Sequence, residues 1–100
     1  MNVAETILKQ LGGGRFKVMT GAKDFIAYDN ALMFRFPTCK GGTCKGASRC
    51  RIELTPDDLY TVTFLKMRKL VVTVLGSQTG IYFDQLEEVF TECTGLYTRL

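Results

Sequence analysis

The sequence predicts an α+β protein in which an antiparallel sheet of about five or six strands is flanked by an N-terminal and a C-terminal helix. Two observations carry this prediction. Apolar residues recur at helical spacing near both ends of the chain, and the segments between them alternate apolar and polar residues in short runs. At 100 residues, with 46% hydrophobic residues and no long linker, residues 1–100 fit a single domain with its own core.

The first dozen residues are expected to form a short helix. Asn2 can cap this helix, Glu5 stands three residues further on as in a capping box, and Ile7 and Leu11 fall on one face. Three glycines at residues 12–14 then precede a strand-like segment. A phosphate-binding glycine loop follows a strand instead, so these glycines favour a helix end and a hinge.

The middle of the chain is expected to form strands. Phe16 and Val18 alternate with polar residues in a first strand, and a turn follows at Gly21. An Asp-Asn pair at residues 29–30 then predicts a two-residue turn of a β-hairpin, whose second strand Pro37 stops because proline has no N–H to donate. The other expected strands occupy residues 25–28, 32–36, 49–54, 59–66 and 70–75.

The last element is the clearest, because its apolar residues recur at helical spacing and its acidic residues lie off that stripe. Gly95 is expected to form a left-handed cap after it, with Leu96 folding back onto the last turn. The pattern predicts an amphipathic helix with the apolar residues Tyr82, Leu86, Val89, Phe90 and Cys93 on one face and the acids Asp84, Glu87, Glu88 and Glu92 on the other.

Residues 38–48 are rich in glycine, lysine, cysteine, threonine and serine, and are expected to form an exposed loop. Two thiols belong to this loop, a third follows it at the start of the next expected strand, and a fourth lies on the apolar stripe of the last helix. They leave three hypotheses open: free thiols, which rank first, a loop disulfide in an oxidised sample, and a zinc site, whose spacing is unusual. The residues concerned are Cys39, Cys44, Cys50 and Cys93.

Nearby cations could lower the pKa of the loop thiols, with Lys40, Lys45 and Arg49 the candidates. The sequence holds no histidine to act as a general base or to complete a mixed metal site. Its paired acids, Asp57-Asp58 and Glu87-Glu88, fit solvated surface charge better than a catalytic pair. The sequence therefore predicts that the protein is not an enzyme and has no cofactor.

The charge distribution provides the best candidate for a functional surface. The net charge of +3 is mild, but residues 35–51 carry five cations and no acid, whereas residues 84–92 carry four acids and no cation. We expect one basic patch that meets phosphates or an acidic protein surface. Its candidate binding residues are Arg35, Lys40, Lys45, Arg49, Arg51, Lys66, Arg68 and Lys69. Phe34, Phe36 and Tyr60 alternate nearby, where they could stack on bases or belong to the core.

The chain resembles a family of small, uncharacterised proteins encoded by tailed bacteriophages and prophages. The resemblance spans nearly the whole chain and rests on AETIL at residues 4–8, QLGG at 10–13, MTGAKDF at 19–25, QLEEVFTE at 85–92 and TGLYT at 94–98. It implies expression in the bacterial host cytoplasm and carries no established activity over to any residue. Residues 38–50 depart from the family's loop, which is rich in asparagine, lysine and glycine and lacks clustered cysteines.

Two functions follow as hypotheses. The first, by analogy with other small phage proteins, is an accessory protein that docks on a host protein or nucleoprotein complex, such as a counter-defence inhibitor of the anti-CRISPR kind. The alternative is a small basic nucleic-acid-binding protein that uses the region of residues 35–51. The sequence has no apolar run of about 18 residues, and Glu5 and Lys9 interrupt any signal peptide, so no membrane association is expected. An oligomer stays open, because a core of this size is small.

Overall fold

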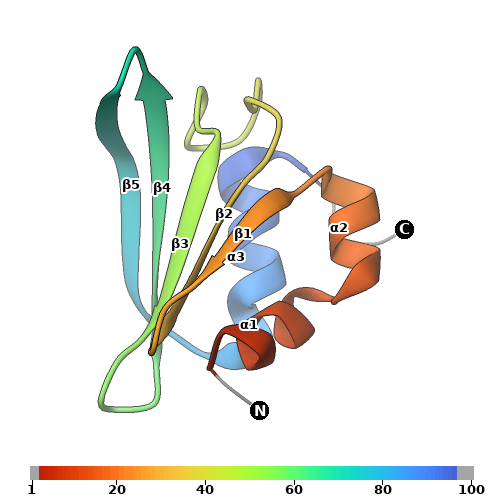
Figure 1. Cartoon of the computed structure of the whole chain (residues 1–100), viewed down its shortest axis with the longest axis vertical. Coiled ribbons are helices and arrows are strands. Elements are labelled where there is room, and N and C mark those ends of the chain that lie inside the picture. Colours follow the sequence, from red (N-terminus) through yellow and green to blue (C-terminus); the bar gives the residue numbers. More distant parts are fainter. Residues whose placement is uncertain (1–2, 97–100) are drawn as a thin grey trace.

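The computed structural model describes residues 3–96 and consists of one five-stranded antiparallel sheet with helices on one face (Figure 1). The strands follow one another in the order β1-β2-β3-β4-β5, so each pairs with its neighbour in sequence. This confirms the predicted α+β class. The elements are α1 (Val3–Leu11), α2 (Gly14–Thr20), β1 (Lys23–Ala27), β2 (Ala31–Arg35), β3 (Arg49–Leu54), β4 (Tyr60–Arg68), β5 (Val71–Ile81), the short 3-10 helix η1 (Phe83–Gln85) and α3 (Leu86–Thr94).

Helix α1 confirms the predicted N-terminal helix, and its proposed cap, Asn2, lies outside the described residues. The segment after it was expected to be a strand, and that prediction is wrong. It forms helix α2, in which Phe16 and Thr20, four residues apart, are both buried while Val18 is 84% exposed. The alternation of Phe16 and Val18 therefore does not indicate a strand, because only one of the two side chains faces the core.

The strands after α2 agree with the expected ones to within two residues at each end, except that β5 is longer than expected. Tyr28 and Ala31 pair across the predicted turn at residues 29–30, where the Tyr28 N–H donates to the Ala31 carbonyl at 2.9 Å. Strand β5 continues to Ile81, past Gly76, where it was expected to end. Gly76 stays in the sheet opposite Phe64, and a side chain there would lie 2.8 Å from the Cys44 sulfur. Gly76 marks close packing rather than a strand end.

The core lies between the helices and one face of the sheet, and Phe90 of α3 is at its centre. The Phe90 ring lies 5.1 Å from that of Phe16 and 5.3 Å from that of Phe36, both nearly perpendicular to it. The rings of Phe34 and Phe64 follow at 6.0 and 6.2 Å. One helical side chain thus joins α2 and the middle strands into one aromatic cluster.

The final helix agrees with the sequence except at its start. Leu86, Val89, Phe90 and Cys93 are buried as predicted, but Tyr82 precedes the helix and is exposed. Gly95 adopts the expected left-handed conformation and its N–H donates to the Thr91 carbonyl, and Leu96 packs against the core. None of the described helices is long and apolar enough to cross a membrane.

The loop of residues 38–48 contains no helix or strand, as expected, yet it is not simply exposed, because Cys39, Cys44 and Ala47 are buried. The loop binds the end of α3: the Cys44 N–H donates to the Cys93 carbonyl at 2.9 Å, and the Thr43 N–H to that of Glu92. Carbonyls in the last turn of a helix have no partner within the helix, so the loop satisfies them. Burial of this loop therefore follows from its role as a cap.

Candidate docking surface

The sheet has a second face, which the helices leave open. Strand residues alternate between faces, so the neighbours of the buried Phe34, Cys50 and Phe64 point away from the core. The register places Lys23 of β1 opposite Arg35 of β2, and Arg35 opposite Arg49 of β3. Three cations on three adjacent strands therefore form one row on the open face.

Like charges directly opposite each other on a sheet are destabilising. The Asp24 carboxylate relieves part of this repulsion through an ion pair with Arg35, and Asp24 itself adopts a left-handed backbone with φ 57°. Among the residues 3–96 that the structure describes, neither Lys23 nor Arg49 forms an ion pair with a carboxylate. The row thus keeps excess positive charge at two of its three positions.

Arg51 lies one row further along the same face and is engaged locally. Its guanidinium is 3.8 Å from the Glu53 carboxylate and 5.5 Å from the centre of the Tyr28 ring. Both contacts are at the surface, where an ion pair stabilises by little. Arg51 therefore extends the basic surface, although part of its charge is already paired.

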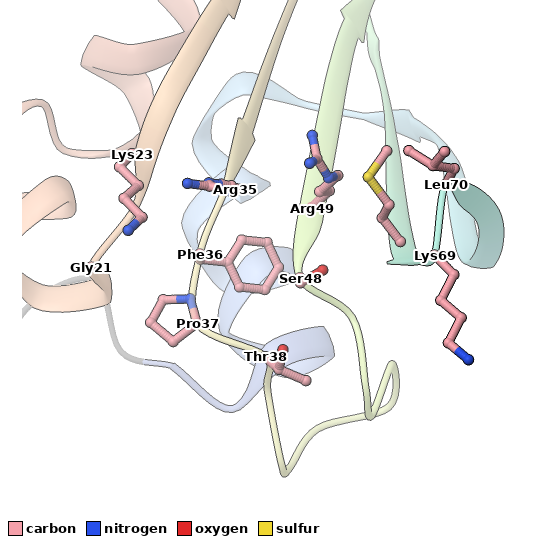
Figure 2. Close-up of a pocket in the computed structure, with 11 residues that line it drawn as sticks. Gly21, Lys23, Arg35, Phe36, Pro37, Thr38, Ser48, Arg49, Lys69 and Leu70 are labelled. Carbon is pink, nitrogen blue, oxygen red and sulfur yellow. The ribbon is translucent and has the colours of Figure 1, made fainter.

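The cationic row borders an open depression of about 670 Å³ (Figure 2). Figure 2 shows Lys23 and Arg35 on one side of it, Lys69 and Leu70 on the other, and Arg49 between them. The remaining lining comes from the strand ends and the chain that flanks them, through Gly21, Phe36, Pro37, Thr38, Ser48 and Met67. We call this feature the basic depression.

The turn between β4 and β5 borders the basic depression with apolar groups. Lys69 and Leu70 form a two-residue turn with φ values of 50° and 69°, a conformation that asparagine and glycine adopt far more easily. Leu70 is 94% exposed. A positive φ is uncommon for a bulky residue such as leucine, and backbone strain of this kind is concentrated at functional sites.

The structure brings together only part of the predicted basic patch. Arg35, Arg49 and Lys69 line the depression, and Arg51 lies on the same face. The other four residues lie elsewhere. Lys40 and Lys45 belong to the loop that caps α3. Lys66 and Arg68 alternate along β4 with Leu65 and Met67, so they point to the opposite face of the hairpin.

Sequence reasoning missed Lys23, Met67 and Leu70. Lys23 reaches the row because β1 pairs with β2 through an irregularity between Lys23 and Ile26, which sequence spacing does not reveal. Leu70 was assigned to a strand, although it forms the turn before β5. A signal did exist in the second case, because two strand-like segments separated by only a few residues are typical of a hairpin.

The predicted aromatic platform is not on this surface. Phe34, Phe36 and Tyr60 are each no more than 4% exposed. Tyr60 donates its hydroxyl to the Gln10 side chain of α1 at 2.7 Å, and burial raises its pKa. These aromatic residues hold the core, so they are not available to stack on bases.

The four cysteines are buried and free, and they do not form a metal centre. Among residues 3–96, no three side chains of histidine, cysteine, aspartate or glutamate are grouped to hold a metal ion. The expected lowering of the thiol pKa is wrong for Cys44 and Cys50. Burial raises the pKa of Cys44, and raises that of Cys50 well above its ordinary value, with the neighbouring Cys93 adding to both. Raised pKa values leave these two thiols protonated and unreactive near neutral pH.

Comparisons of the chain with protein-family models, with curated proteins and with solved structures found no match.

Proposed function

We propose that this protein is a non-enzymatic docking protein that binds the acidic surface of another protein through the basic depression and the adjoining Leu70 turn. The observation that carries the proposal is the row of cations beside a 94% exposed leucine, and two of these cations form no ion pair with any residue that the structure describes. Arginine and methionine are enriched at protein interfaces, where an apolar anchor surrounded by polar groups provides most of the affinity. The depression combines these groups on one face.

The resemblance to tailed-phage proteins supplies the setting for this proposal. In a bacterial host cytoplasm the partner would be a host protein or nucleoprotein complex, and a counter-defence inhibitor is one form that such docking takes. Positive charge on the open face would speed association with an acidic partner. Arg35 and Arg49 each offer a planar guanidinium that can bind a carboxylate through two hydrogen bonds.

Nucleic-acid binding is the second candidate, and the same row of cations favours it, because phosphates would also relieve the repulsion between Lys23, Arg35 and Arg49. The burial of Phe34, Phe36 and Tyr60 counts against it. Exposed aliphatic side chains at Leu70 and Met67 fit a protein partner better than bases, which stack on aromatic rings.

The test is a pull-down from bacterial lysate with and without nuclease, using three forms of the tagged protein. The site variant carries Lys23→Ser, Arg49→Ser and Lys69→Ser. The matched control carries Lys40→Ser, Lys45→Ser and Lys66→Ser, which removes the same number of cations from other parts of the surface.

A specific host protein that survives nuclease, stays with the control and is lost from the site variant is the expected result. Equal loss from both variants would show that total charge, rather than the basic depression, governs binding. Recovery of nucleic acid alone would replace the proposal with the second candidate. Salt-dependent retention of a single-stranded oligonucleotide by the purified protein would confirm that replacement.

A further inference from the structure

The two edges of the sheet differ in how well they are protected against pairing with another strand. At one edge, β1 has five residues, two of them the charged Lys23 and Asp24, and its register is irregular. At the other edge, β5 has eleven residues and lies in a stretch, residues 70–83, that contains no charged residue. Natural proteins protect sheet edges with charges, irregularities and short strands. Strand β1 has all three, and β5 has no charge along an unusual length.

Strand β5 also has the composition of a buried strand, although several of its apolar side chains are exposed. Val71, Val72 and Val74 are each half or more exposed, and Leu75 is exposed as well. Runs of β-branched residues are typical of strands that are covered on both sides. Figure 1 shows the β4–β5 hairpin projecting beyond the helices, so none of the helices that the structure describes covers its outer part.

The outer part of β5 is also its most regular part. Its pairing with β4 is unbroken from Val71 opposite Arg68 to Val74 opposite Leu65. The two register irregularities, between Phe64 and Leu65 and between Tyr60 and Val62, fall on the inner part of the hairpin. Irregularities bend a strand away from a new partner, so Val71–Val74 is the segment best able to accept one.

We propose that Val71–Val74 of β5 pairs with the same segment of a second copy of this chain, antiparallel and about a two-fold axis, which joins the two sheets into one. The occupant follows from charge. The protein carries a net charge of +3, yet residues 70–83 are charge-free, so two copies can approach along this edge without opposing like charges. Antiparallel pairing of identical strands is the arrangement that a two-fold axis produces.

This pairing supplies what the edge lacks. Each copy provides the other's outward N–H and C=O groups with hydrogen-bond partners, as in strand addition generally. It also brings Val72 and Val74 of one copy beside those of the other, covering apolar side chains that a single copy leaves in water. The inference goes beyond the docking function and does not depend on it, because the edge of β5 and the basic depression adjoin each other but share no residue.

The test measures the mass of the purified full chain by light scattering and sedimentation over a series of concentrations. Two variants place charges on the edge: Val72→Lys with Val74→Lys, and Val72→Glu with Val74→Glu. A control, Ile26→Lys, places a charge on the opposite edge strand, at a residue that is exposed to a similar extent. Circular dichroism and urea unfolding establish that each variant is folded.

We expect the unaltered chain and the Ile26→Lys control to form dimers. Each doubly charged variant alone should dimerise at least about tenfold more weakly, because like charges then face each other across the two copies. Mixing the lysine and glutamate variants in equal amounts should restore the dimer. A monomeric unaltered chain throughout the series, or a lysine variant that dimerises as well as the unaltered chain, overturns the proposal. Because no partner protein is present, neither result bears on the docking function.

Discussion

The two faces of the sheet are built from the same strands and differ in almost everything else. On the covered face, Phe34, Cys50 and Phe64 lie opposite one another and are at most 1% exposed. On the open face, the neighbouring row places Arg35 opposite Arg49. The covered face therefore stabilises the fold, and the open face tolerates a repulsive row that costs only about 0.2–1 kcal/mol per opposed pair. A surface that costs stability is best explained by a function, which is why the docking site is proposed there.

The largest effect should come from the centre of the covered face. Phe90→Ala removes the ring that contacts Phe16, Phe34, Phe36 and Phe64, and should lower the free energy of unfolding by about 3–5 kcal/mol. Urea unfolding followed by circular dichroism measures this. Val18→Ala, at a residue that is 84% exposed, is the control and should change stability by less than about 0.5 kcal/mol. Equal effects would mean that the aromatic cluster is not the core.

The next effect concerns the loop that caps α3. Gly42 has φ 77°, and a Cβ there would lie 2.4 Å from the Cys93 carbonyl oxygen. Gly42→Ala should therefore cost about 2–3 kcal/mol, with faster amide exchange at Thr43 and Cys44 as the loop leaves the helix. The matched control is Gly46→Ala, which has a similar backbone, φ 95°, and open space around it. Its cost should be about 1 kcal/mol, and an equal cost for both would show that the loop does not bind α3.

The exclusion of water from the covered face can be tested through the pH dependence of the free energy of unfolding. Burial raises the pKa of Cys50 well above its ordinary value of 9.0, so the folded protein holds this proton more tightly than the unfolded chain does. The stability that this provides is complete below pH 9.0 and is lost as the pH rises above it. Unfolding free energy should fall in that range, and Cys50→Ala should reduce the fall by up to about 1 kcal/mol over the first pH unit.

The comparison for Cys50→Ala is between slopes, because the variant also loses packing at every pH. Both proteins are measured by urea unfolding near neutral pH and at several values above 9.0. Parallel curves would mean that the Cys50 thiol is not buried in the folded protein.

The smallest effect separates stability from function on the open face. Lys69 and Leu70 adopt the left-handed conformations of a turn that Asn-Gly prefers, so Lys69→Asn with Leu70→Gly should raise stability by about 1 kcal/mol. The same variant should bind the proposed partner less well, because it loses both the exposed leucine and the Lys69 cation of the basic depression. Leu70→Ala keeps the strain and removes most of the side chain, so it should weaken binding without adding stability. If urea unfolding shows the Lys69→Asn, Leu70→Gly variant to be no more stable than the unaltered chain, the turn is not strained.

Much of the fold could be predicted from the sequence. The α3 stripe of Leu86, Val89, Phe90 and Cys93, the Gly95 cap and the hairpin turn at residues 29–30 all depend on neighbours within a few residues, where local chemistry decides. Helix α2 was missed because its seven residues are too few to establish a period, and contact with the core selects Phe16 over Val18.

The candidate site was only half predictable, because sequence distance does not give sheet position. Residues 35–51 were correctly identified as basic, but the structure divides them between two places. Arg35, Arg49 and Arg51 share the open face of the sheet, whereas Lys40 and Lys45 lie in the loop that caps α3. Lys23 joins the site from a strand that is distant in the predicted pattern.

The sequence by itself determined the α+β class, the positions of most elements and the excess of cations in its middle third, since these follow from composition and from periods within single segments. Only the tertiary structure decided which face of the sheet each strand residue occupies, which thiols are buried and which edge of the sheet is left unprotected. The physical reason is that register, and the helices that cover one face, place residues far apart in sequence beside one another. A one-residue shift of register would exchange the basic row with the aromatic core.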